Sequence, residues 1–127
     1  MSEAEFLVHS RDVPPDQAGE LLHLPRQAAN WEWMSFYVRR LLPGETYQAQ
    51  SDGEETAFVL LGGICRADWG SGQQQIGKRK NVFDGFPYAV YSPPSNRVTF
   101  KAETVCEIAE CRVPSQAQLE PKLITPS

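Results

Sequence analysis

Short apolar runs interrupted by proline or glycine dominate the chain, and apolar residues do not recur at helical spacing over any long stretch. Valine, isoleucine and aromatic residues are frequent in these runs, a composition typical of β-strands. The pattern predicts strands at residues 21–24, 33–42, 46–50, 57–61, 64–69, 74–77, 89–91, 97–101 and 105–113. It predicts turns between them, including one at Gly62-Gly63. A short helix over residues 16–22 is an open alternative.

Many short strands at regular spacing predict an all-β fold, either a β-sandwich or a jelly-roll barrel. The chain has 127 residues and 41% hydrophobic content, which is enough for one domain with a core but too little for two. We expect that domain at residues 20–113. Residues 1–19 are polar and are expected to form an N-terminal arm. Residues 114–127 are polar and rich in proline, and they predict a C-terminal tail that resembles an interdomain linker.

Charge and hydropathy exclude several classes of partner. The net charge is -4, and the twelve basic residues are scattered along the chain, which argues against a nucleic-acid-binding surface. No apolar run is long enough to span a bilayer, and the first residues lack the basic start of a signal peptide. The sequence therefore predicts a cytoplasmic protein that binds neither nucleic acid nor membrane.

Three cysteines occur without a CxxC motif or a neighbouring histidine. Cys106 and Cys111 would point to opposite faces of one strand, roughly 16 Å apart, which is too far for a disulfide. Together with Cys65 they are expected to be reduced thiols in the core.

The spacing around Glu55 resembles the first motif of cupins, which are small β-barrels of the jelly-roll type. In cupins, His-x-His is followed after three or four residues by a glutamate and, after six more intervening residues, by a glycine. Here Gln48 and Gln50 stand in place of the histidines, before Glu55 and Gly62. The second cupin motif has a Pro-x-Gly turn followed by histidine, and the histidine position falls on Val98.

These replacements remove the ligands that a metal would need. A catalytic zinc usually takes three protein ligands, mostly imidazole or carboxylate, whereas glutamine is a weak donor and valine is none. His9 and His23 do not have the spacing of a ligand pair, and we expect them to be surface or packing residues. The sequence therefore predicts no bound metal and no cofactor.

Gln48 and Gln50 share one face of their predicted strand because side chains two apart point the same way. If that face is the barrel interior, they and Glu55 line a polar pocket. Glu55 would then need water or a cation beside it, and Arg40 and Arg66 are the nearest candidates. Alternatively, these polar side chains fill a closed barrel through internal hydrogen bonds.

The segment VFDGFPYAVYSPP at residues 82–94 also has two interpretations. Its aromatic residues could simply pack in the core or at its rim. Asp84, Tyr88 and Tyr91 also offer a carboxylate and two phenolic hydroxyls, which suit hydrogen bonding to a polyol at the mouth of a barrel. The candidate ligand-binding set is Arg40, Gln48, Gln50, Glu55, Asp84, Tyr88 and Tyr91.

Three segments resemble the N-terminal half of 5-deoxy-glucuronate isomerase, a two-cupin enzyme of bacterial myo-inositol catabolism. They are RLLPGE at residues 40–45, ETAFVLLGG at 55–63 and VFDGFPYAVYSPP at 82–94. The resemblance implies a cupin barrel and an ancestry among aldose-ketose isomerases. It also implies that the catalytic metal belongs to the C-terminal cupin, whose ligand motifs do not occur in this sequence.

Three hypotheses on function follow. The first is a structural or assembly module without the metal-bearing catalytic half. The second is a metal-free cupin that binds a sugar acid or a similar small polar ligand. The third is a metal-independent isomerase with Glu55 as the base and Arg40 as the electrophile. Since half of a two-cupin protein would expose an apolar surface, a homodimer is also expected.

Overall fold

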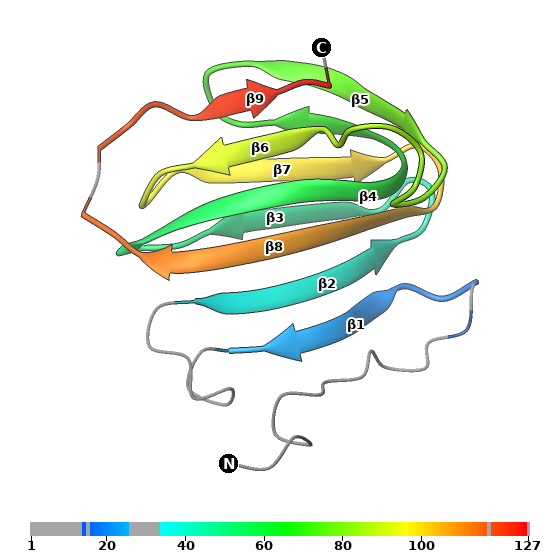
Figure 1. The fold of residues 1–127 in the computed structure, drawn as a ribbon, viewed down its shortest axis with the longest axis horizontal. Coiled ribbons are helices and arrows are strands. Elements are labelled where there is room, and N and C mark those ends of the chain that lie inside the picture. The colour runs from blue at the N-terminus through cyan, green and yellow to red at the C-terminus, as the bar shows by residue number, and fades with distance from the viewer. Residues whose placement is uncertain (1–13, 15, 26–33, 117, 127) are drawn as a thin grey trace.

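The computed structural model describes residues 14, 16–25, 34–116 and 118–126, which fold into nine β-strands (Figure 1). The strands are β1 (Gly19–Leu24), β2 (Ser35–Leu41), β3 (Thr46–Gln50), β4 (Glu54–Asp68), β5 (Gln73–Arg79), β6 (Ala89–Ser92), β7 (Arg97–Ala102), β8 (Cys106–Pro114) and β9 (Lys122–Ile124). None of the described residues forms a helix long and apolar enough to cross a membrane.

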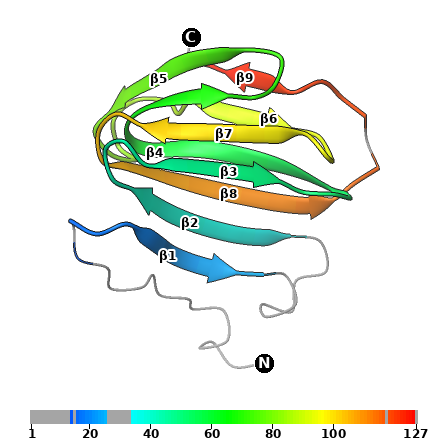
Figure 2. The same cartoon turned by 180° about the vertical axis from the view of Figure 1, so that it is seen from behind.

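The strands form two antiparallel sheets that face each other across the core (Figures 1 and 2). Sheet A has the order β1-β2-β8-β4-β6-β9, and sheet B has the order β3-β7-β4-β5. Strand β4 belongs to both sheets, because its first half pairs with β8 and β6 and its second half pairs with β7 and β5. This is the two-sheet arrangement of a jelly roll, as the strand spacing predicted.

Gly62 and Gly63 allow β4 to pass from one sheet to the other. The strand pairing shifts register on both sides of these glycines, between Leu60 and Gly62 and between Gly63 and Cys65. Gly63 has a positive φ of 96°, and a Cβ there would overlap the carbonyl oxygen of Val105. The prediction of a turn that separates two strands was therefore wrong, because glycine here forms a bulge inside one strand.

Alternating inward residues of the two sheets build an apolar core. Phe58 of sheet A and Phe100 of sheet B pack with their ring centroids 5.1 Å apart. The other members of the core are Leu41, Ala49, Leu60, Cys65, Ala67, Ile76, Val90, Val98, Ala102, Cys106 and Ile108.

Both ends of the described chain differ from expectation. The open alternative of a short helix at residues 16–22 is wrong among the described residues there, because Gly19–Leu24 pairs with β2 as an edge strand; this confirms the strand predicted at residues 21–24 and extends it to Gly19. Residues 1–13 and 15 of the expected arm, which include His9, and Trp33 of an expected strand lie outside the described residues. Part of the expected tail is strand β9, which pairs with β6 and packs Leu123 against the core.

The cysteines are free thiols, and the two on β8 lie on opposite faces of the strand as predicted. Cys65 and Cys106 are fully buried, and the hydrogen bond between them, together with burial, raises the pKa of the Cys65 thiol. Cys111 is only half-buried and lies on the outer face of sheet A, so the prediction that it belongs to the core was wrong.

Candidate functional site

Gln48 and Gln50 lie on the outer face of β3. Both side chains are exposed, while Tyr47 and Ala49 between and beside them point toward the interior. Gln48 donates a hydrogen bond to the hydroxyl of Thr99 at 3.4 Å, and Gln50 donates to the carbonyl oxygen of Ser95 at 2.9 Å. The glutamines therefore do not line a pocket inside the barrel.

The inward positions of β3 and β7 determine whether the barrel could hold a cupin metal. Ala49 pairs with Val98, and Tyr47 pairs with Phe100. Except for the Tyr47 hydroxyl, which hydrogen-bonds to Glu110, these side chains offer no donor atoms, so this donor set does not fit a transition metal. Across the described part of the chain, His, Cys, Asp and Glu side chains form no group of three that could hold a metal ion.

Glu55 and Tyr91 do meet, but on the outer face of sheet A. The Tyr91 hydroxyl donates a hydrogen bond of 2.7 Å to a carboxylate oxygen of Glu55. Burial raises the pKa of Tyr91 to about 12, with the hydrogen bond and the charge of Glu55 acting in the same direction. This pair is the one part of the predicted ligand-binding set that the structure brings together.

Neither arginine proposed as a partner of Glu55 contacts it. Arg40 binds Glu107, with Nη2 to Oε1 at 3.1 Å, and also donates to the carbonyl oxygen of Pro14 at 2.8 Å. Arg66 donates to Gln73 at 3.1 Å. On β8, Arg40 lies opposite Glu107 while Glu55 lies opposite Val113, an offset of roughly 20 Å at the usual rise per residue. Glu55 and Arg40 therefore cannot act together as base and electrophile on one small substrate.

Asp84 and Tyr88 have structural contacts. The Asp84 carboxylate accepts a hydrogen bond from the backbone N–H of Lys80 at 3.0 Å, which closes the loop between β5 and β6. Tyr88 packs against the apolar core. The carboxylate and the two phenols expected at a barrel mouth therefore do not converge on one ligand.

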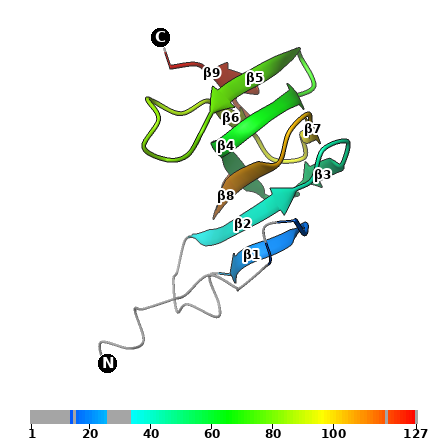
Figure 3. The same ribbon diagram turned by 90° about the vertical axis from the view of Figure 1, so that its right-hand side faces the viewer.

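The β5–β6 loop projects from the side of the barrel (Figure 3). The buried side chain of Arg79 fixes its conformation by hydrogen bonds. The Arg79 guanidinium donates to the carbonyl oxygens of Leu60, Val82 and Gly85, at 2.6, 3.0 and 3.4 Å. The loop nevertheless presents Phe83 and Phe86 to solvent, with 91% and 77% of their surface exposed. A well-anchored loop with two exposed aromatic side chains is typical of a contact surface for another protein.

A polar cluster that the sequence reasoning missed lies at the inner face of β8. Glu110 is 2% exposed. Its carboxylate accepts hydrogen bonds from the Tyr47 hydroxyl at 2.7 Å and from Arg112 Nε at 2.6 Å. Burial, together with the hydrogen bond to Glu110, raises the pKa of Tyr47 to about 12. The buried charge is thus compensated from both sheets.

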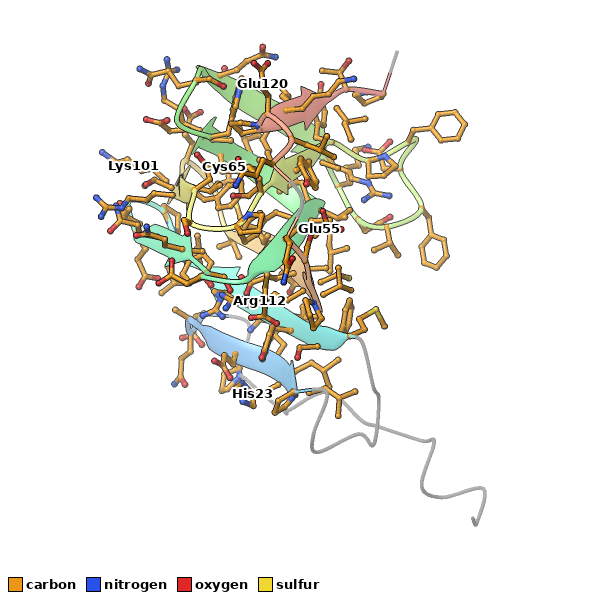
Figure 4. The ribbon with its side chains drawn as sticks, turned by 90° about the vertical axis from the view of Figure 1, so that its left-hand side faces the viewer. His23, Glu55, Cys65, Lys101, Arg112 and Glu120 are labelled. Atoms are coloured by element: carbon orange, nitrogen blue, oxygen red, sulfur yellow. The ribbon has the colours of Figure 1, made fainter. Side chains whose placement is uncertain are left out.

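Strands β1 and β2 extend this cluster toward the open side of the barrel, where β2 and β3 are not paired. Arg39 stacks on the Tyr47 ring, with its Cζ 3.9 Å from the ring centroid. His23 Nδ1 lies 2.9 Å from a carboxylate oxygen of Glu20, and its ring packs against the Tyr37 ring at an interplanar angle of 54°. Figure 4 shows His23 and Arg112 beside β1 and β2. A cavity of about 200 Å³ lies among Glu20, His23, Tyr37, Arg39, Glu110 and Arg112.

A signal for this cluster was present in the sequence. Strict alternation through residues 106–112 places Glu110 and Arg112 on the same face as Cys106 and Ile108, which are core residues. Two charged residues on an inward face predict a buried ion pair.

The two antiparallel sheets, joined by one strand that crosses between them, define a cupin-type β-barrel. Solved cupins of low identity show the same fold, among them a predicted oxalate decarboxylase from Thermotoga maritima with a TM-score of 0.60 and 13% identity. The superposition covers 81% of the Thermotoga maritima chain and 77% of this chain. The chain itself belongs to the KduI/IolB family, which it matches over residues 7–127.

Individual relatives agree with this assignment. The chain is 29% identical to the 5-deoxy-glucuronate isomerase of Geobacillus thermodenitrificans, and the match covers 98% of this chain and 45% of that enzyme. It is 30% identical to the enzyme of Geobacillus kaustophilus, covering 42% of it. An IolB-like protein from Salmonella typhimurium superposes with a TM-score of 0.81 at 30% identity, over 94% of this chain and 46% of that chain. The chain thus spans about half the length of the curated relatives it matches.

Proposed function

We propose that this domain is a structural, non-catalytic cupin module of the KduI/IolB family and that it works by assembly. The observation that carries this proposal is the filling of the barrel: Ala49, Phe58, Val98 and Phe100 are buried at positions that would face a ligand in an open cupin. The dispersal of the residues expected to bind a sugar acid supports the same view.

The outer face of sheet A supports assembly. Most side chains at the centre of this face are apolar although they alternate with the core residues, which is typical of a sheet covered on both sides. The face is built by Phe36 and Val38 of β2, Ala57 and Val59 of β4, Ala89 of β6, Ala109, Cys111 and Val113 of β8, and Ile124 of β9. The Tyr91–Glu55 pair and the Arg40–Glu107 ion pair lie on the same face and supply polar contacts.

The β5–β6 loop continues this surface. It leads directly into β6, and a hollow of about 510 Å³ at its base includes Leu61, Val82 and Val105. Phe83 and Phe86 would therefore add aromatic contacts at the edge of an interface centred on sheet A.

The partner we propose is a second copy of this chain, in the cytoplasm. A two-fold axis lets one apolar face cover an identical one, so that both copies bury the same residues. Two sheets packed face to face lie about 10 Å apart with interdigitating side chains. The small and medium-sized side chains of the outer face suit that distance.

Sedimentation velocity over a range of concentrations tests the proposal. We expect a dimer, and we expect the double substitution Phe83→Ser/Phe86→Ser to raise the dimer dissociation constant at least tenfold. Both rings are exposed in the single chain, so their loss should leave folding intact. Leu119→Ser, which replaces an exposed apolar residue in the segment between β8 and β9, is the matched control and should leave dimerisation unchanged.

Two results would contradict the proposal. A chain that stays monomeric at high micromolar concentration has no such interface. Turnover of 5-deoxy-glucuronate by the purified chain, with zinc, manganese or iron supplied and with loss of activity in Glu55→Gln, would show catalysis.

A further inference from the structure

We propose that Cys65 and Cys106 form a redox-sensitive pair, which a small disulfide such as glutathione disulfide converts to an internal disulfide bond. Both thiols belong to the apolar core, and both are fully buried. The pair lies inside the barrel, so this proposal does not depend on the assembly surface proposed on the outer face of sheet A.

The two sulfur atoms meet where β4 passes from one sheet to the other. Cys65 lies on the second half of β4, and Cys106 is the first residue of β8. The Cys65 thiol donates a hydrogen bond to Cys106, and Cys106 Sγ donates in turn to the carbonyl oxygen of Ile64 at 3.0 Å. The sulfur atoms are therefore already in contact, and a short approach brings them to the disulfide bond length of roughly 2.0 Å.

The third cysteine cannot compete for either partner in the folded chain. Cys106 and Cys111 point to opposite faces of β8, which excludes a disulfide between them. Cys65 packs in the core, whereas Cys111 lies on the outer face of sheet A. The fold thus offers one internal disulfide and leaves Cys111 as a separate thiol.

The hydrogen bond between the thiols gives them different roles in thiol–disulfide exchange. The bond from Cys65 lowers the pKa of Cys106, whereas the same bond, together with burial, raises the pKa of Cys65. The attacking species in such an exchange is the thiolate. Cys106 is therefore the thiol that reacts first, and Cys65 is the thiol that completes the internal bond.

The exchange consists of two displacements at sulfur. The Cys106 thiolate attacks one sulfur of glutathione disulfide, breaks its S–S bond and releases one glutathione thiolate. The Cys65 thiol then loses its proton, and its sulfur attacks Cys106 Sγ, which breaks the mixed disulfide and releases the second glutathione. Two protein thiols are oxidised, one glutathione disulfide is reduced, and the two thiol protons end on the two glutathione molecules.

A hollow of about 510 Å³ at the base of the β5–β6 loop adjoins the pair. Its lining includes Gly62, Gly63, Val105 and Glu107, so it flanks Cys106 on both sides along the chain. A Cβ at Gly63 would lie 3.0 Å from Cys106 Sγ, so the backbone of this glycine lies close to the sulfur. Strand pairing is interrupted on both sides of the two glycines, which favours local opening. Such an opening exposes Cys106 to a hollow of a size that suits a small ligand.

Equilibration with glutathione redox buffers tests the inference in the Cys111→Ser chain, which keeps only the proposed pair. The chain is reduced or cross-linked in urea and then refolded, so that slow access to buried thiols does not limit the result. Mass spectrometry measures the ratio of internal disulfide to dithiol. At one glutathione composition, we expect this ratio to be at least tenfold higher in the folded chain than in urea, because folding holds the two sulfur atoms together.

Cys65→Ser is the matched control, since it also keeps two thiols, Cys106 and Cys111. Folding separates these two, so their ratio of internal disulfide to dithiol should be lower in the folded control than in urea. For the Cys111→Ser chain, a ratio in the folded state equal to or below that in urea would overturn the proposal. So would glutathione adducts of single thiols in place of the internal bond, or a cross-linked chain whose circular dichroism shows that it does not refold.

Discussion

Tyr47 and Tyr91 each donate a hydrogen bond from the phenolic hydroxyl to a carboxylate, one on each side of sheet A. Tyr47 donates to Glu110 inside the barrel, and Tyr91 donates to Glu55 outside it. An ionised phenolate in either place would lose the hydrogen bond and repel the carboxylate. Burial and these contacts therefore raise the pKa of each phenol from 10.0 to about 12.

This shift predicts a loss of stability at alkaline pH. The neutral phenols contribute fully below pH 10.0, the unfolded value, and the contribution is lost as pH rises toward about 12, the folded value. Absorbance at the phenolate band should show that Tyr47 and Tyr91 ionise late. Tyr47→Phe and Tyr91→Phe should each remove one late equivalent. Titration of all four tyrosines near their ordinary pKa in the folded chain would contradict the two contacts.

At the residue scale, the sequence predicted which side chains face the core better than it predicted their hydrogen-bond partners. Tyr47 and Ala49 alternate with Gln48 and Gln50, and hydropathy alone puts the apolar pair inside. The similarity to a cupin motif suggested the reverse for the glutamines. The pairing of Glu55 with Tyr91 rather than with an arginine depends on which strands become neighbours in sheet A. Local spacing does not contain that information.

Strand β4 is the element that joins the two sheets, and its length depends on Gly62 and Gly63. Only a residue without Cβ fits at Gly63, because its φ is positive and the backbone of Val105 and Cys106 lies against it. Gly53 also has a positive φ, of 78°, but has open space around it. Alanine substitution at both glycines therefore distinguishes the cost of a positive φ, which both would have, from the cost of steric overlap, which only Gly63 would have.

Gly63→Ala should therefore destabilise the fold far more than Gly53→Ala. For Gly53→Ala we expect about 1 kcal/mol, the cost of placing Cβ in the left-handed region. For Gly63→Ala we expect at least about 3 kcal/mol, because β4 and β8 must also separate to avoid the overlap. Urea unfolding measures both. An equal loss of unfolding free energy in the two variants would show that the passage of β4 between the sheets does not require close approach of Gly63 to β8.

At the element scale, most strands could be predicted from apolar runs and turn residues, and strand β3 has its expected bounds, Thr46–Gln50. The failures have a common cause. Strand β9, which was not predicted, has only three residues, and strand β1, predicted at residues 21–24, begins already at Gly19 as an edge strand with a bulge. Such segments become strands because a neighbour offers free backbone groups, and their own sequences carry little β signal.

At the scale of the whole molecule, apolar side chains fill the centre of the barrel, and the outer face of sheet A is apolar over much of its area. The Phe58–Phe100 contact occupies the centre of the core, while the outer face of sheet A keeps side chains that water solvates poorly. The matched relatives are about twice as long as this chain. The proposed dimer would give this domain a neighbour of its own kind.

Cys111 reports directly on that interface, because it lies in the centre of the outer face, opposite Phe36 and Ala57 in the strand pairing. Alkylation of Cys111 under native conditions should be slow at concentrations where the dimer forms and should become faster on dilution. Cys65 and Cys106 are fully buried and should stay unlabelled throughout, which shows that the fold is intact. Cys111→Ser assigns the labelled site.

The Phe83→Ser/Phe86→Ser variant sharpens the measurement. If the aromatic loop and sheet A form one continuous interface, this variant should label Cys111 quickly even at high concentration, while its other two thiols remain protected. Since burial raises the pKa of the Cys111 thiol, rates are compared at one fixed alkaline pH, below the range in which the tyrosines titrate. A labelling rate that is the same at every concentration, in samples that sediment as dimers, would show that the chains associate through a different face.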